Sequence, residues 1–142
     1  MTQLDFLLGM LFIWFVLIIG IAVSTVLLIV RIIRKTGCKT VLISLGIHLV
    51  LFAVTVLYTA SHSTYYRYND WEILQSNVYE VQEKYGAFDL GKISEGHSGT
   101  VAYFIYEDNG PIMPDHLDHF YYMEYDENGI IYKVYNGCAP GG

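Results

Sequence analysis

The densest group of side chains that could do chemistry is Pro114-Asp115-His116-Leu117-Asp118-His119. On one helical turn Asp115, Asp118 and His119 would share a face, and with His116 they could offer oxygen and nitrogen ligands to a metal ion. No H-E-x-x-H motif or close cysteine pair supports such a site, and both acidic turns place glycine fourth rather than sixth, unlike a calcium loop. We therefore expect a solvated loop ahead of a strand, without metal or cofactor.

A second motif, Gly96-His97-Ser98-Gly99, has a serine between glycines. A nucleophile elbow needs G-x-S-x-G, and Thr100 occupies the place of its last glycine. We expect a hairpin turn here. Because no other catalytic motif is present, an enzyme is the weakest of our hypotheses.

A different candidate lies within an apolar stretch, where five polar residues recur on one helix face: Ser44, His48, Thr55, Thr59 and His62. An ionisable side chain in hydrocarbon is a functional candidate, because it is costly to leave unpaired. A neutral imidazole bonded to Ser24 or Ser44, or facing a partner helix, satisfies His48 without function, and we expect this role. Haem ligation would need a second axial ligand, and the first apolar run offers none at matching depth.

Two uncharged runs, 6–30 and 40–60, hold these residues and are each long enough as helices to cross a hydrocarbon core of roughly 30 Å. The loop 31–39 is short, so the runs should pack as an antiparallel transmembrane hairpin. Gly20 and Ser24 on the first run, and Gly46, Ala53 and Ala60 on the second, are small residues that let helices approach closely. The same hairpin could also mediate homo-oligomerisation.

Charge predicts the orientation of this hairpin. Four of the eight basic residues lie in the loop: Arg31, Arg34, Lys35 and Lys39. The positive-inside bias therefore places the loop, with Cys38, in the cytoplasm and both termini, with Cys138, outside the cell membrane. A cleaved signal peptide is the rival interpretation of the first run, but its start is acidic, its apolar stretch is long, and it lacks a small-x-small cleavage site.

From residue 61 onward the chain has 13 acidic and four basic residues, a formal charge of −9. Such a surface is unsuited to nucleic acid. All 13 tyrosines lie from Tyr58 onward. We expect residues 61–68 to form an interfacial linker. Five aromatic residues in or near this segment are typical of an aromatic belt at a membrane surface: Tyr58, Tyr65, Tyr66, Tyr68 and Trp71.

The sequence then predicts one continuous helix, with Asn69 as N-cap, Glu72 as its capping-box partner and Gly86 as the stop. Its apolar face comprises Trp71, Leu74, Val78, Val81 and Tyr85.

Beyond Gly86 the period changes to two, which indicates strands at 100–107 and 120–134 and a weaker strand at 87–94. A two-residue Asn128-Gly129 loop would pair Glu124 with Lys133, Tyr125 with Tyr132 and Met123 with Val134. The alternative, a type I turn with a bulge at Gly129, shifts this register by one. The expected fold is thus a transmembrane hairpin (1–60) followed by a small α+β domain (69–137), in which one helix packs on a three- to four-stranded antiparallel sheet, with a tail at 138–142.

We interpret the chain as a membrane-tethered extracytoplasmic module that binds another protein, as an immunity factor, exclusion factor or accessory subunit does. Tyrosine favours this role, because its ring gives contact area at low rotamer entropy. The expected binding residues are Tyr122, Glu124, Lys133 and Tyr135 on the solvent side of the hairpin, and Asp108, Asp115 and Asp118 in the acidic loop. The alternative is a ligand, metal or pH sensor built on the His/Asp loop.

Overall fold

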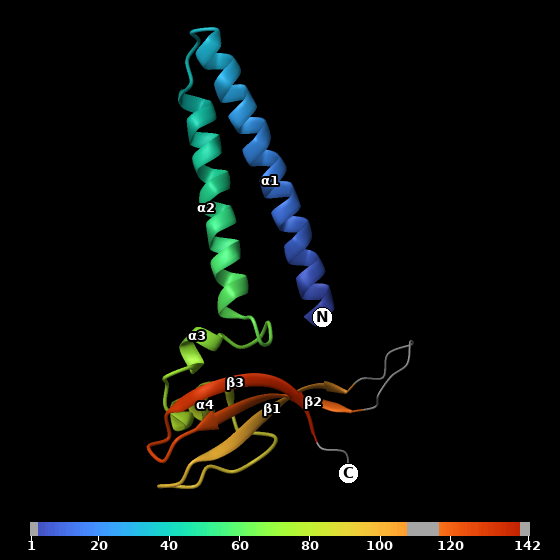
Figure 1. Cartoon of the computed structure of the whole chain (residues 1–142), viewed down its shortest axis with the longest axis vertical. Coiled ribbons are helices and arrows are strands. Elements are labelled where there is room, and N and C mark those ends of the chain that lie inside the picture. Colours follow the sequence, from blue (N-terminus) through green and yellow to red (C-terminus); the bar gives the residue numbers. More distant parts are fainter. Residues whose placement is uncertain (1–2, 108–116, 140–142) are drawn as a thin grey trace. The chain divides into compact units, whose positions relative to one another are not determined.

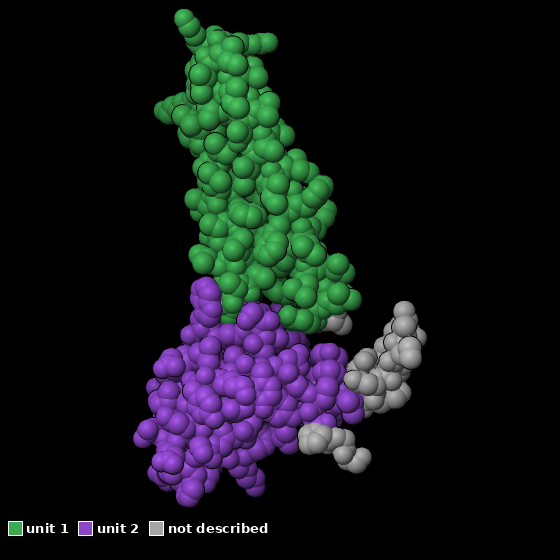
Figure 2. All heavy atoms as spheres, in the orientation of Figure 1, with its two compact units in different colours: residues 1–61 green, residues 62–142 purple. Residues whose placement is uncertain are grey.

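The computed structural model describes residues 3–107 and 117–139 of the chain (Figure 1). Two compact units divide it, residues 1–61 and residues 62–142, which Figure 2 colours separately. The predicted order of elements is confirmed in outline: two long apolar helices come first, and short helices with a three-stranded antiparallel sheet follow.

The first unit is a pair of helices, α1 (Gln3–Ile33) and α2 (Lys39–Ser61), both longer than the predicted runs. Each is long and apolar enough to cross a membrane. The turn between them is closed by backbone bonds, including Thr36 N–H to the carbonyl of Arg31 at 2.9 Å, and by the Arg31 guanidinium, which donates to the Gly37 carbonyl at 2.8 Å. Lys35 adopts a left-handed conformation with φ of 52° where the chain reverses.

In the second unit the predicted continuous helix is wrong, because the chain forms two short helices, α3 (Asp70–Ile73) and α4 (Val78–Tyr85). The Asn69 and Gly86 caps are present as predicted. The first helix nevertheless ends at Ile73, because Leu74 is extended with a ψ of 130° and Gln75 follows with a φ of 73°, and Asn77 caps the second helix. Two backbone bonds with Ile131 replace the helical ones: Gln75 N–H donates to the Ile131 carbonyl, and Ile131 N–H donates to the Ser76 carbonyl. Sheet pairing thus overrides local helix propensity at this point.

Three antiparallel strands form the sheet in the order β1-β2-β3: β1 (Gly99–Glu107), β2 (Asp118–Tyr125) and β3 (Ile131–Cys138). The weaker strand predicted at 87–94 is reduced to one isolated bridge, in which Leu90 pairs with Ala102 at the β1 edge. The sheet therefore has three strands and not four within the described residues.

At the tip of the β2–β3 hairpin the chain adopts the alternative turn. Gly129 N–H donates to the Asp126 carbonyl at 2.9 Å, and Gly129 has a φ of 78°, as in a type I turn followed by a glycine bulge. Tyr125 consequently pairs with Ile131, and the predicted pairing with Tyr132 is wrong. A second bulge, at Tyr132, adds one residue and restores the predicted register, in which Glu124 faces Lys133 and Met123 faces Val134.

Tyrosine dominates the core between the sheet and the short helices. Tyr121 and Tyr125 are fully buried, and the ring of Tyr68 contacts four other tyrosines at centroid distances of 4.7–5.9 Å: Tyr65, Tyr85, Tyr103 and Tyr121. The aromatic-belt interpretation is therefore wrong for Tyr65, Tyr66 and Tyr68, which pack in or against this core, whereas Tyr58 and Trp71 are exposed. The segment expected to be a linker thus supplies core side chains.

Candidate functional site

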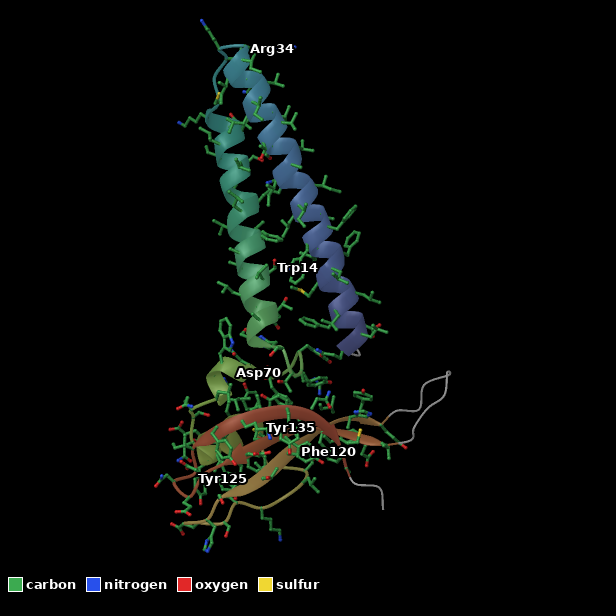
Figure 3. All side chains as sticks on the ribbon, in the orientation of Figure 1. Trp14, Arg34, Asp70, Phe120, Tyr125 and Tyr135 are labelled. Carbon is green, nitrogen blue, oxygen red and sulfur yellow. The ribbon has the colours of Figure 1, made fainter. Side chains whose placement is uncertain are left out.

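The candidate site is the face of the sheet that points away from the core, here called the open face: Ala102, Phe104, Phe120, Tyr122, Glu124, Lys133 and Tyr135. These residues alternate along the strands with core residues, as the pleat requires. The buried cluster on this side, Ala102, Phe120 and Tyr122, is joined only by Tyr135 and Ala139 among the described residues, so neither α3 nor α4 covers it. Figure 3 labels Phe120 and Tyr135 on the sheet.

Aromatic rings form a continuous row across the open face. Phe104 meets Phe120 edge-on at 5.7 Å, Phe120 lies 5.9 Å from Tyr122, and Tyr122 stacks on Tyr135 at 5.2 Å with ring planes 15° apart. Gly137 makes room for this row, because a Cβ there would lie 3.2 Å from the Tyr122 ring. Such pairs add roughly 0.5–1.5 kcal/mol each beyond area burial, so contacts between the rings stabilise the row.

The expected exposure of Tyr122 is wrong: the residue is only 8% exposed, because Phe120 and Tyr135 enclose its ring and its hydroxyl reaches the Cys138 carbonyl at 3.5 Å. Tyr135 is half-buried. The accessible part of the row is instead Phe104, which is 43% exposed. Phe104 is therefore the ring of the row that is most exposed to solvent.

A charge pair borders the row. Lys133 Nζ lies 2.8 Å from Glu124 Oε1 and 4.6 Å from the centre of the Tyr135 ring, and the Tyr132 hydroxyl donates to Glu124 at 3.2 Å. The bond from Lys133 lowers the pKa of Glu124, and the same bond raises the pKa of Lys133. An exposed pair of this kind contributes little to stability. Its effect here is to neutralise the one cation of the face.

Of the acidic loop, Asp108, Asp115 and His116 lie outside the described residues. Asp118 is exposed and pairs across the strands with Glu107. His119 stacks on Tyr106 at 4.4 Å, and its Nδ1 lies 3.6 Å from Cys138 Sγ. Within residues 3–107 and 117–139, no three His, Cys, Asp or Glu side chains gather closely enough to hold a metal ion.

The Gly96–Gly99 motif forms a turn, as predicted, in which His97 N–H donates to the Ser94 carbonyl at 3.3 Å. It does not join two strands of the sheet, because the described segment just before it pairs with β1 through a single isolated bridge, Leu90 with Ala102. The imidazole of His97 lies 3.0 Å from the Glu95 carbonyl and does not approach the serine through any described bond.

The polar residues of the helix pair form a seam between α1 and α2. His48 Nδ1 lies 2.7 Å from the Ser44 carbonyl and donates to it, because a carbonyl oxygen can only accept. Ser24 and Ser44 hydroxyls are 3.4 Å apart, and the His48 ring fills the space at Gly20, where a Cβ would lie 2.3 Å from it. Gly20 and Ser24 thus contact the second helix, as the sequence predicts.

Two features of the seam differ from expectation. Gly46, Ala53 and Ala60 lie on the exposed side of α2, so their expected role in the contact between the helices is wrong. Trp14 was missed: its indole N–H donates to Thr55 Oγ1 at 3.1 Å, and Figure 3 shows it between the helices. The sequence gives no indication that Trp14 lies at the contact between the helices, because neither tryptophan nor its spacing from Gly20 is specific to such a contact.

Sequence reasoning also missed Asp70, which is 3% exposed. Its carboxylate accepts bonds from the Ser63 hydroxyl and the Thr64 N–H, both at 2.8 Å, and from the Tyr121 hydroxyl at 2.7 Å. Burial, followed by this bond to Asp70, raises the pKa of Tyr121 far above its ordinary value of 10.0. The group ties the segment before α3 to the middle strand of the sheet.

Comparisons with known proteins give no further guide. No protein-family model matches the chain, and neither the curated proteins nor the solved structures give a match.

Proposed function

We propose that the chain is a membrane-tethered, extracytoplasmic protein-binding module. The observation that carries this proposal is the open face: a row of aromatic rings on one side of a small sheet, which neither α3 nor α4 covers in the part of the chain that the structure describes. Aromatic residues are enriched in protein interfaces, where they combine apolar contact with hydrogen bonding.

The tether in this proposal is the helix pair. Both helices have the length and hydropathy of membrane spans, and the turn between them carries Arg31, Arg34, Lys35 and Lys39. The positive-inside bias supports a cytoplasmic turn, with the open face on the opposite side of the cell membrane. An immunity factor, an exclusion factor and an accessory subunit of a membrane complex all need such a module next to the membrane.

Cysteine labelling tests the orientation. A membrane-impermeant maleimide on intact cells should modify Cys138, which is exposed, and should reach Cys38 only after the cells are opened. Cys38→Ser and Cys138→Ser single variants assign each signal to its residue. Labelling of Cys38 but not Cys138 on intact cells would place the module in the cytoplasm and contradict the proposed orientation.

Photo-crosslinking in intact cells tests the binding surface. A photoreactive phenylalanine analogue at Phe104 should give one discrete adduct with another protein, whereas the same analogue at Tyr79, which is 49% exposed on α4, should give none. Tyr135→Ser, which removes a ring of the row, should abolish the adduct. Equal adducts at both positions, or none at Phe104, would contradict the proposal.

A further inference from the structure

The outer edge of β3 has backbone groups that point away from the sheet. Ala139 N–H donates to the Asp118 carbonyl at 2.9 Å, and the register is unbroken from His119 with Cys138 to Glu124 with Lys133. Hydrogen-bonded pairs alternate with non-bonded pairs in an antiparallel ladder. The N–H and C=O groups of Val134, Asn136 and Cys138 are therefore directed outward. Figure 1 shows β3 at one edge of the sheet.

The beginning of this edge is already paired with the chain's own backbone. Gln75 N–H donates to the Ile131 carbonyl at 2.8 Å, and Ile131 N–H donates to the Ser76 carbonyl at 3.0 Å. Segment 75–77 thus behaves as a short added strand, which ends where the bulge at Tyr132 begins. The edge thus accepts strand-like pairing at one end, and beyond it no further described segment of the second unit pairs with its backbone.

From Val134 to Cys138 the edge lacks the usual protection. These residues include no charge and no proline, which are the features that commonly block edge pairing. Cys138 is partly satisfied by the Tyr122 hydroxyl. Within the described residues, no hydrogen bond from outside the sheet reaches the backbone of Val134 or Asn136, so two donors and two acceptors are available there.

Charge indicates what would occupy the edge. Residues 61–142 carry a formal charge of −9, and Lys133, the only cation of β3, is neutralised by Glu124. A second copy would bring the same negative charge, whereas a basic segment would be attracted.

We propose that the β3 edge binds an extended, cationic segment of a partner protein by strand addition. This inference rests on the proposed protein-binding function and names the chemistry of the partner. Backbone bonds to Val134 and Asn136 would hold the segment, and lysine or arginine side chains would select it.

The test uses the full chain in nanodiscs of zwitterionic lipid. The probe is a fluorescent ten-residue peptide of alternating valine and lysine. The control peptide has the same pattern with glutamate in place of lysine. Asn136→Pro removes one outward N–H without breaking the bonds between β2 and β3, and Asn136→Ala keeps that N–H. Fluorescence anisotropy should show binding of the lysine peptide to the wild type and to Asn136→Ala, with an affinity at least about tenfold lower for Asn136→Pro.

Hydrogen exchange keeps the test decisive if Asn136→Pro fails to fold. In the wild type, the lysine peptide should slow exchange of the Val134 and Asn136 amides, and the glutamate peptide should not. Equal binding to a folded Asn136→Pro variant, or no added protection in the wild type, would overturn strand addition. A wild-type dimer that Asn136→Pro dissociates would assign the edge to a second copy and overturn the proposal too.

The two proposals fail separately. If the Phe104 adduct forms in cells with both the wild type and Asn136→Pro, the protein-binding function stands and strand addition is excluded. If Phe104 gives no adduct in the wild type while the lysine peptide binds the edge, the edge inference stands and the open face is not the binding surface.

Discussion

Asp70 shows how one buried carboxylate organises the second unit. It accepts three hydrogen bonds while 3% exposed, and all three donors come from outside α3. The position could not be predicted from the sequence, because an acidic residue in a first helical turn is equally favoured on the surface by the helix dipole. Burial of Asp70 depends on Ser63, which is 7 residues away in the sequence, and on Tyr121, which is 51 residues away, and no sequence pattern connects the three.

We predict that Asp70→Ala lowers the free energy of unfolding by on the order of 3 kcal/mol, because three buried donors lose their acceptor. Tyr121→Phe removes a single bond and should cost about 1 kcal/mol. Chemical denaturation of the full chain in detergent, followed by near-ultraviolet circular dichroism, measures both. An Asp70→Ala variant as stable as Tyr121→Phe would show that water replaces the lost acceptor.

The buried tyrosines predict an alkaline limit to stability. Burial raises the pKa of Tyr103 and Tyr121 far above the ordinary 10.0, and that of Tyr65 to about 12. Below pH 10 these groups are neutral in both states, so their contribution is complete. Above pH 10 the unfolded chain ionises first, and each group lowers stability by up to about 1.4 kcal/mol per pH unit until its folded pKa is reached.

Phenolate absorbance and circular dichroism should therefore change together in one cooperative step above pH 10. Tyr79→Phe, which removes an exposed ring, should leave the midpoint of this step unchanged. A gradual titration without loss of structure would show that water reaches these hydroxyls in the folded state.

At the scale of elements, local signals were sufficient where they agreed with the tertiary structure and failed where pairing competed with them. The caps Asn69 and Gly86 were predictable, because capping chemistry is local. The break at Gln75 was not predictable, because it depends on backbone bonds to Ile131, which lies 56 residues later in the chain. The Glu124–Lys133 register was predicted correctly although two bulges, rather than a two-residue loop, produce it.

The contact between α1 and α2 gives a prediction at this scale. Gly20→Ala should destabilise the helix pair in detergent, because its Cβ would lie 2.3 Å from His48 Cδ2. On a His48→Ala background the same change should be tolerated, since the ring is gone. A double-mutant cycle on the unfolding free energy should give a coupling above about 1 kcal/mol. Additive effects would show that His48 moves away from Gly20 without cost.

At the scale of the whole molecule, the boundary of the second unit decides what can be isolated. Tyr65 is 4% exposed in the core, and Ser63 and Thr64 bind Asp70, although the sequence predicts an interfacial linker at 61–68. A periodic pattern cannot identify these residues as core, because clustered tyrosines are equally typical of a membrane interface.

We predict that residues 62–142 fold in water, whereas residues 66–142 are less stable by about 3 kcal/mol or more, because loss of a buried ring leaves a cavity and Asp70 loses two donors. Urea unfolding of the two fragments measures this difference. Tyr65→Ala within 62–142 should account for most of it. Equal stability would show that the core closes without this segment.

The distribution of tryptophan has a practical consequence for spectroscopy. The chain has two such residues, and each unit contains one: Trp14 on α1, bonded to Thr55, and Trp71 on α3, which is 56% exposed. Indole emission shifts to longer wavelength in water, so the emission maximum of Trp71 should lie at a longer wavelength than that of Trp14. A quencher confined to lipid tails would report Trp14, and one dissolved in water would report Trp71. Native fluorescence can thus follow the melting of each unit separately, without any added dye.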